Sequence, residues 1–102
     1  MVDEAAPVNA GDEAQVKGRK SKARRQREAE LAALASILST KGGRRFVWRL
    51  LEEAKIHSTS FAVEATITAF NEGKRHVGLW ALAEVFEADP SAYTRMRQEA
   101  SE

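Results

Sequence analysis

The chain has 102 residues, with 16 basic and 15 acidic side chains and no cysteine. This length allows one domain at most, the lack of cysteine excludes disulfides and thiolate metal sites, and no apolar run approaches the roughly 20 residues that a membrane span needs. The charges are segregated: residues 1–16 carry only acidic charges, and residues 17–27, here called the basic segment, carry only basic ones.

Residues 1–21 have no periodic apolar pattern and are rich in small and charged side chains. Such a segment buries too little surface to offset the entropy of ordering. We therefore predict a disordered, acidic-then-basic arm over 1–21 and a helical domain over 22–102. The first helix of this domain is expected within 21–38, where Leu31, Leu34, Ala35 and Leu38 recur at helical spacing.

A second helix is predicted over GRRFVWRLLEEA, Gly43–Ala54, after two glycines that break the first helix. Its apolar residues fall on one broad face, which predicts that Phe46, Leu50 and Leu51 are core residues. The charged residues of the segment lie on the opposite side of the helix.

Three further helices are expected. In residues 61–73 the stripe Val63, Ile67 and Phe70 is predicted to be buried, with Gly73 as a left-handed cap at the end. Residues 74–88 have an apolar arc wide enough for a central helix, and Asp89 and Pro90 form a start signal for the last one. The predicted fold class is all-α, a small bundle of four to five short helices.

No catalytic arrangement emerges from the sequence. His57 and His76 have no histidine or carboxylate at the spacing of a metal pair, and the serines lack the context of an activated nucleophile. We therefore expect a protein that is not an enzyme and has no metal or cofactor.

The basic segment is a candidate for contact with nucleic acid, because clustered cations neutralise phosphates and release counterions. The alternative is a solvated arm that serves solubility or docks on an acidic protein. The candidate residues are Lys17, Arg19, Lys20, Lys22, Arg24, Arg25 and Arg27.

Two tryptophans and a pair of arginines are candidates for a second surface. Arg44 and Arg45 stand near a helix start that could hold a phosphate or carboxylate. Trp48 lies at the edge of an apolar face and is either an interface anchor or a packing residue. For Trp80, core packing is the favoured interpretation.

Four segments, taken together, resemble a known family. They are GRRFVWRLLEEA from Gly43, STSF from Ser58, FNEGKRHVGLWAL from Phe70 and DPSAYTRM from Asp89. Their order and spacing over about residues 42–97 are similar to those of a small helical protein family of tailed bacteriophages, of the Bordetella-podophage type. The chain departs from the pattern at Lys74, where arginine is usual.

The resemblance implies an origin in a tailed double-stranded-DNA phage or a prophage, and a gene among those for virion morphogenesis. At the shared positions, Gly78 within a predicted helix indicates close approach of another backbone. Arg44 and Arg45 are expected to join Glu72 and Arg75 in one ion-pair cluster between the second helix and the turn before the fourth. The full set of candidates for an interface or ion-pair cluster is Arg44, Arg45, Trp48, Arg49, Glu72 and Arg75.

The favoured hypothesis is a non-enzymatic virion or virion-assembly protein, located in the virion or the host cytoplasm. Its expected partners are phage head, connector or internal virion proteins, with non-specific DNA contact through the basic segment and self-association as further options. The alternative is a nucleic-acid-binding accessory or regulatory protein. Sequence-specific reading by the second helix is disfavoured, because its two terminal glutamates repel phosphate.

Overall fold

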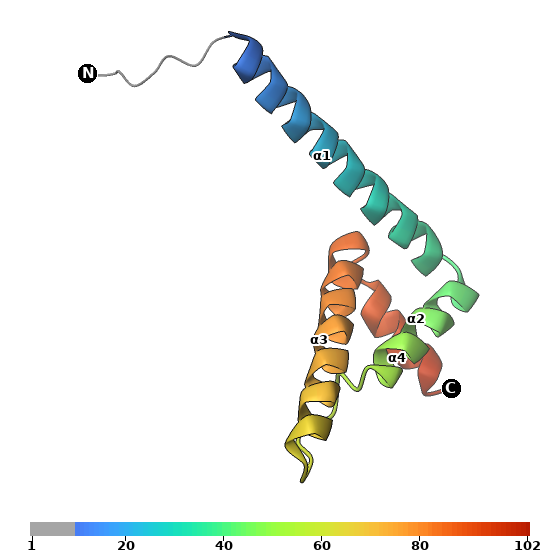
Figure 1. Ribbon diagram of the computed structural model, residues 1–102. Coiled ribbons are helices and arrows are strands. Elements are labelled where there is room, and N and C mark those ends of the chain that lie inside the picture. Colours follow the sequence, from blue (N-terminus) through green and yellow to red (C-terminus); the bar gives the residue numbers. More distant parts are fainter. Residues whose placement is uncertain (1–9) are drawn as a thin grey trace. The chain divides into compact units, whose positions relative to one another are not determined.

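Helices make up the regular structure of the residues that the computed structural model describes, 10–102. They are α1 (Ala10–Leu38), α2 (Lys41–Glu53), α3 (Ala65–Ala88) and α4 (Ala92–Ala100), as Figure 1 shows. The predicted all-α fold is therefore confirmed. The chain divides after Glu30 into two units, and the second, Leu31–Glu102, holds the last turns of α1 and all of α2, α3 and α4.

Helix α1 begins well before the predicted point. The expectation of disorder up to residue 21 is wrong for residues 10–21, which are helical, while residues 1–9 lie outside the described part of the chain. Asp12 and Glu13 occupy the first turn, where negative charge favours a helix. Glu13 also precedes a lysine by four residues, a spacing at which opposite charges stabilise a helix. These charges favour a helix over residues 10–21 even though that segment has no apolar stripe.

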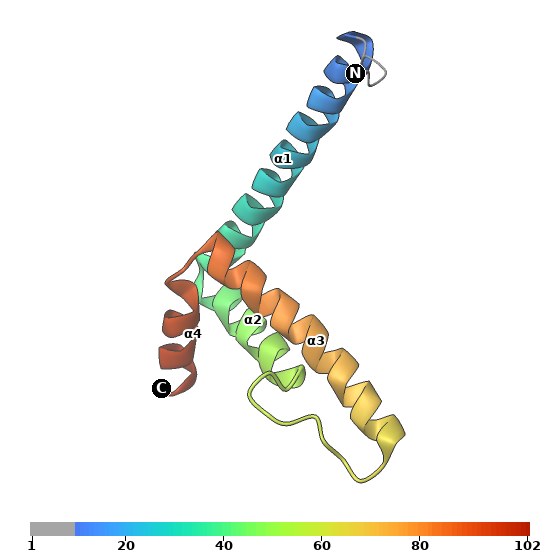
Figure 2. The same ribbon diagram turned by 90° about the vertical axis from the view of Figure 1, so that its left-hand side faces the viewer.

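The core of the second unit draws on all four helices (Figure 2). Leu38 of α1, Leu51 of α2 and Val85 of α3 are at most 1% exposed, as is Met96 of α4. The predicted stripe of α1 is thus confirmed at Leu38. The complete set of buried apolar residues is Leu38, Val47, Leu51, Ala54, Ile56, Val85, Ala92 and Met96.

Helix α2 ends in a Schellman motif with an unusual residue at its left-handed position. The N–H of Lys55 donates to the carbonyl of Glu52 (2.9 Å), and the N–H of Ile56 donates to that of Leu51 (3.5 Å). Lys55 has φ of 60°, a conformation that usually favours glycine. The buried side chains of Ile56 and Leu51 supply the apolar contact that accompanies this motif.

Helix α3 joins the two helices that the sequence placed on either side of Gly73. The prediction of a left-handed cap there is wrong: Gly73 is inside the helix, and no glycine among the described residues has positive φ. Gly78, by contrast, has the predicted close neighbour. A Cβ at this position would lie 2.7 Å from Cγ2 of Ile56 and also clash with Ala54. The backbone of α3 can approach the end of α2 only because this residue has no side chain.

Helix α4 begins at Ala92, two residues after the predicted start at Pro90, and its N-cap is Ser91 rather than the predicted Asp89. The Asp89 carboxylate accepts hydrogen bonds from the backbone N–H of Ser91 (3.1 Å) and from its hydroxyl (2.8 Å). These bonds, the hydroxyl's foremost, hold the pKa of Asp89 below its ordinary value. Asp89 thus fixes the turn between α3 and α4.

Candidate protein-interaction site

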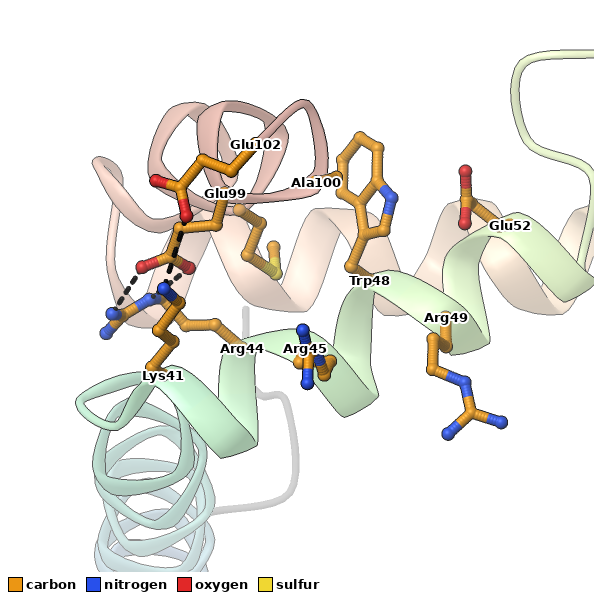
Figure 3. Close-up of a pocket in the computed structure, with 10 residues that line it drawn as sticks. Lys41, Arg44, Arg45, Trp48, Arg49, Glu52, Glu99, Ala100 and Glu102 are labelled. Atoms are coloured by element: carbon orange, nitrogen blue, oxygen red, sulfur yellow. Dashed lines mark hydrogen bonds and ion pairs between the residues drawn. The ribbon is translucent and has the colours of Figure 1, made fainter.

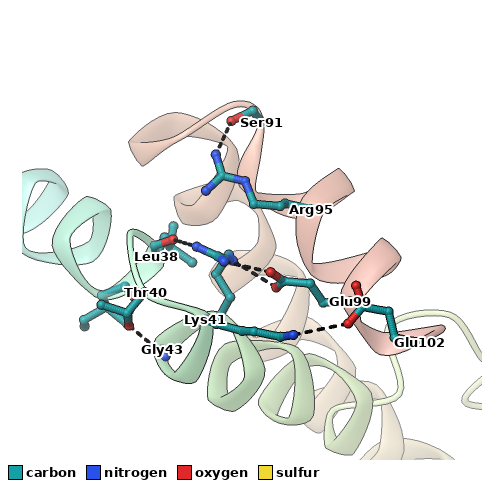
Figure 4. Close-up of polar contacts among 10 residues, drawn as sticks. Leu38, Thr40, Lys41, Gly43, Ser91, Arg95, Glu99 and Glu102 are labelled. Carbon is teal, nitrogen blue, oxygen red and sulfur yellow. Dashed lines mark hydrogen bonds and ion pairs between the residues drawn. The ribbon is translucent and has the colours of Figure 1, made fainter.

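Arg44 of α2 connects three helices, because its side chain contacts Leu38 of α1 and Glu99 of α4. Figure 4 shows these two partner residues. Thr40 caps α2 by accepting a hydrogen bond from the N–H of Gly43 (3.0 Å), which fixes the turn from which Arg44 projects. The Arg44 side chain, in a residue only 7% exposed, meets Glu99 of α4 through Nε (2.9 Å) and Nη2 (2.7 Å). Its Nη1 donates to the carbonyl of Leu38 at the end of α1 (3.0 Å).

This two-point contact favours the charged forms of both Arg44 and Glu99. The hydrogen bond from Arg44 lowers the pKa of the Glu99 carboxyl, and the same bond raises the pKa of the Arg44 guanidinium. The sequence left open a phosphate or carboxylate at this helix start, and the group that Arg44 binds is the carboxylate of Glu99 in the same chain. Glu99 was missed because it is 55 residues away from Arg44. Arg44 is a structural residue rather than a free binding group.

A cavity of about 320 Å³ lies beside this contact, between α2 and α4, and is here called the Arg45 pocket (Figure 3). Neither Arg45 nor Arg49 forms an ion pair within residues 10–102. Both are exposed residues of its lining, as is Glu52, whereas Lys41 pairs with Glu102 at 3.2 Å. The lining residues are Lys41, Arg44, Arg45, Trp48, Arg49, Glu52, Met96, Glu99, Ala100 and Glu102.

Trp48 stands at the edge of both the pocket and the core. Its ring is half-buried and lies 5.9 Å from the ring of His57 and 5.8 Å from that of Tyr93. His57 Nε2 is in turn 2.7 Å from the Tyr93 hydroxyl. The sequence did not predict this aromatic group, because Tyr93 is 36 residues away from His57 in the chain. Trp48 thus packs on two aromatic rings and lines the same pocket as Arg45 and Arg49, and tryptophan and arginine are residue types enriched at protein-binding hot spots.

The predicted ion-pair cluster of Arg44, Arg45, Glu72 and Arg75 does not form. Arg44 pairs with Glu99, and Arg75 instead donates through Nη2 to the carbonyl of Ile56 at 3.5 Å. Arg75 lines a separate cavity formed by α3 and the segment after α2, and none of the other three residues reaches that cavity. Glu99 of α4, rather than Glu72 of α3, supplies the carboxylate for Arg44.

The largest departure from the sequence analysis is an exposed apolar surface on α2 and α3. It comprises Phe46, Leu50, Phe70, Val77 and Trp80, here called the apolar face. All five are exposed, from 49% for Leu50 to 68% for Phe70, so the predicted core positions of Phe46, Leu50, Phe70 and Trp80 are wrong. Val63, 99% exposed, and Ile67 also lie outside the core.

Helix geometry puts this face on the side of the α2–α3 pair away from α4. Trp48 contacts Tyr93, and Phe46 and Leu50 are each two residues from Trp48, about 200° around the helix. On α3, Phe86 packs against Tyr93 with ring centroids 5.5 Å apart. Val77 precedes Phe86 by nine residues, which is two and a half turns, so it points to the opposite side.

The basic segment is helical. It lies within α1, where six of its seven cationic side chains are exposed and Arg27 is partly buried, 3.7 Å from Glu30. At 100° per residue the seven cations surround the helix instead of forming one stripe. This arrangement suits contact with phosphates on several sides, and its role in DNA contact stays a prediction.

Among residues 10–102, no helix is long and apolar enough to cross a membrane, and no three histidine or acidic side chains gather as metal ligands. The helical unit, its buried Arg44 contact and its exposed apolar face define the class of this protein, a small all-helical module.

The comparison with protein families identifies this module. The model of the Bbp19-like phage protein family matches residues 34–98, and the chain therefore belongs to that family. This family match confirms the resemblance noted over residues 42–97, and it shows that the chain is a phage protein. Neither the comparison with curated proteins nor that with solved structures gives a match.

Proposed function

We propose that this phage protein is a non-enzymatic virion or virion-assembly protein that docks on other phage proteins through its apolar face. The expected partners are head, connector or internal virion proteins. The basic segment adds a contact with DNA whose strength depends on salt. The protein would act in the virion or, during assembly, in the host cytoplasm.

The apolar face is the observation that supports this proposal. Aromatic side chains present about 150–250 Å² each, so the five exposed residues offer on the order of 550 Å² of apolar surface. This is at the upper end of the roughly 300–600 Å² found for the largest patch of a typical monomer, where such patches are often functional. Water contact with this much apolar area is unfavourable, and a protein partner would remove it.

Mass spectrometry of purified particles tests the proposal. We expect the chain in particles of the phage that encodes it, at a fixed ratio to the capsid protein. In phage carrying Leu50→Asp, the ratio should fall, because the charge interrupts the apolar face. The matched control is Val63→Asp, at a fully exposed position outside that face, which should leave the ratio unchanged. Equal ratios in all three phages would rule out docking through the apolar face.

The alternative, a nucleic-acid-binding accessory protein, is supported by the helical basic segment. It predicts a chain that is absent from mature particles and binds free DNA. Fluorescence anisotropy with a DNA duplex, comparing the full chain with a truncation that starts at Glu28, measures the contribution of the segment. Absence from both mature particles and assembly intermediates, combined with tight DNA binding, would favour this alternative.

A further inference from the structure

The cavity between α3 and residues 54–64, which follow α2, is here called the Arg75 pocket. Its volume is about 250 Å³, below the roughly 300–1,000 Å³ of pockets for drug-sized ligands, so it suits a small group. The lining consists of three cations, three hydroxyls and one amide: Lys55, Ser58, Thr59, Ser60, Asn71, Lys74 and Arg75. It contains no acidic residue, whereas three glutamates line the Arg45 pocket.

Arg75 has more hydrogen-bond donors than the chain has acceptors near it. Its Nη2 donates to the carbonyl of Ile56 over 3.5 Å, which is long for such a bond. Its Nε is buried without a partner, and its Nη1 also has none but reaches solvent. Arg75 is partly buried and forms no ion pair within residues 10–102. A guanidinium drawn out of water without a counter-ion is unfavourable, so an anion in the pocket would stabilise it.

Lys55 lines the same pocket from a strained backbone position. Its φ is 60°, a conformation that glycine adopts without strain and other residues rarely do. Residues held in such conformations cluster at functional sites, where the side chain compensates for the strain. The third cation, Lys74, lies beside the ring of Phe70, with its ammonium 5.8 Å from the ring centroid. Positive charge therefore reaches the pocket from two elements, α3 and the end of α2.

Helix α3 holds the other wall of the pocket in place. The Thr68 hydroxyl accepts from the N–H of Ala62 (2.9 Å) and donates to its carbonyl (3.1 Å). One turn later, Asn71 donates through Nδ2 to the carbonyl of Ser60 (3.3 Å). The hydroxyls of Ser58 and Ser60 themselves form no hydrogen bond in the part of the chain that the structure describes. Both are therefore free to donate, and they are positioned before a ligand arrives.

We infer that the Arg75 pocket binds the phosphate group of a small molecule, either inorganic phosphate or a nucleoside monophosphate. A phosphate group has acceptor oxygens that point in several directions, and here donors approach from both α3 and residues 54–64. A planar carboxylate needs only one guanidinium, as the contact of Glu99 with Arg44 shows. The inference does not rest on the proposed function, because no residue of the apolar face or of the basic segment lines this pocket.

The number of cations distinguishes this ligand from the backbone of DNA. A phosphate at the end of a molecule carries up to two negative charges and three acceptor oxygens. A phosphate within a DNA strand carries one charge and lies in a row of others, which suits an extended basic surface such as the basic segment. A closed pocket with three cations fits the single, more highly charged group better.

Isothermal titration calorimetry of the full chain, at fixed ionic strength, tests the site with inorganic phosphate and with a nucleoside monophosphate. We expect one phosphate group per chain, and the tighter of the two ligands identifies its source. Arg75→Gln and Lys55→Gly should each weaken binding by about 10-fold or more, the effect of losing a charge-assisted hydrogen bond. Lys55→Gly separates binding from folding, because glycine at this position should stabilise the chain while it weakens phosphate binding.

Arg97→Gln is the matched control. It removes the same charge as Arg75→Gln, from an exposed residue of α4 outside both cavities, and should leave the phosphate affinity unchanged. Circular dichroism of each variant establishes that its helix content is retained.

Four results would overturn the inference. They are no binding at millimolar phosphate, an affinity that neither pocket substitution changes, an equal loss of affinity in Arg97→Gln, and displacement of phosphate by an equal concentration of acetate. The third result would indicate general attraction of anions to the chain. The fourth would indicate a site for a carboxylate of a protein partner.

Discussion

Replacing Gly78 with alanine adds one methyl group at the closest approach of α3 to the end of α2, and two effects of opposite sign compete. Alanine stabilises a helix interior by about 1 kcal/mol relative to glycine. The new Cβ, however, would lie 2.7 Å from Cγ2 of Ile56 and clash with Ala54, and both neighbours belong to the buried core. Overpacking of this kind costs about 1–3 kcal/mol.

Because one methyl group meets two core residues at once, we place the overpacking cost near the top of that range. The net result expected for Gly78→Ala is a loss of about 1–2 kcal/mol in the free energy of unfolding. With a urea dependence of about 1 kcal/mol per molar for a domain of this size, the midpoint should fall by about 1–2 M. Urea titration followed by far-UV circular dichroism measures this shift.

Gly73→Ala is the matched control, since it changes the same residue type in the same helix. A Cβ at Gly73 would meet nothing within 4 Å outside its own turn, so only the gain in helix propensity of about 1 kcal/mol applies. The two substitutions should therefore move the midpoint in opposite directions. A stabilised Gly78→Ala variant would refute the close approach and, with it, the packing of α3 on α2.

Three further predictions concern charge and backbone conformation. The pKa of Glu99 is lowered in the folded state by Arg44, so this pair stabilises the fold above the ordinary carboxyl pKa of 4.5, and the contribution is lost as the pH falls through the lowered value. In the Glu99→Gln variant, the melting temperature should depend less on pH in that acid range than it does in the unsubstituted chain. If the melting temperatures of the two proteins change in parallel with pH, the lowered pKa of Glu99 is contradicted. Lys55→Gly should stabilise the chain by about 1 kcal/mol in urea titrations, because glycine relieves the left-handed strain, and an unchanged midpoint would argue against that conformation. For DNA binding, seven phosphate contacts predict a slope of log K against log salt near −6, and removal of the basic segment should bring it close to zero; a slope that survives truncation would place the contact elsewhere.

The sequence was most informative where a signal depends on a few neighbouring residues. The Asp89 turn and the need for glycine at position 78 could be recognised because each follows from local sterics or hydrogen bonding. The break before α2 was also predicted, but its stated cause is wrong, because Gly42 and Gly43 lie inside α2 and Thr40 caps that helix. Gly73 misled the prediction because glycine is compatible with both a cap and a helix interior. The local sequence does not choose between them.

The binding surfaces were harder to predict, for two physical reasons. Arg44 can pair with many carboxylates in the sequence, and only the position of α4 beside α2 selects Glu99. The local sequence contains no information about that distance. The pairing therefore became visible only when residues 55 positions apart were placed side by side.

The second reason concerns what an apolar stripe means. Helical periodicity identified Phe46, Leu50 and Phe70 as residues that avoid water, but it does not specify which surface covers them. One side of α2 and one side of α3 contribute to the core, through buried residues such as Leu51 and Val85. A protein acting alone gains nothing from a second apolar stripe, which lowers its solubility. Helical periodicity alone therefore does not distinguish an apolar stripe that faces the core from one that remains exposed after the core is filled.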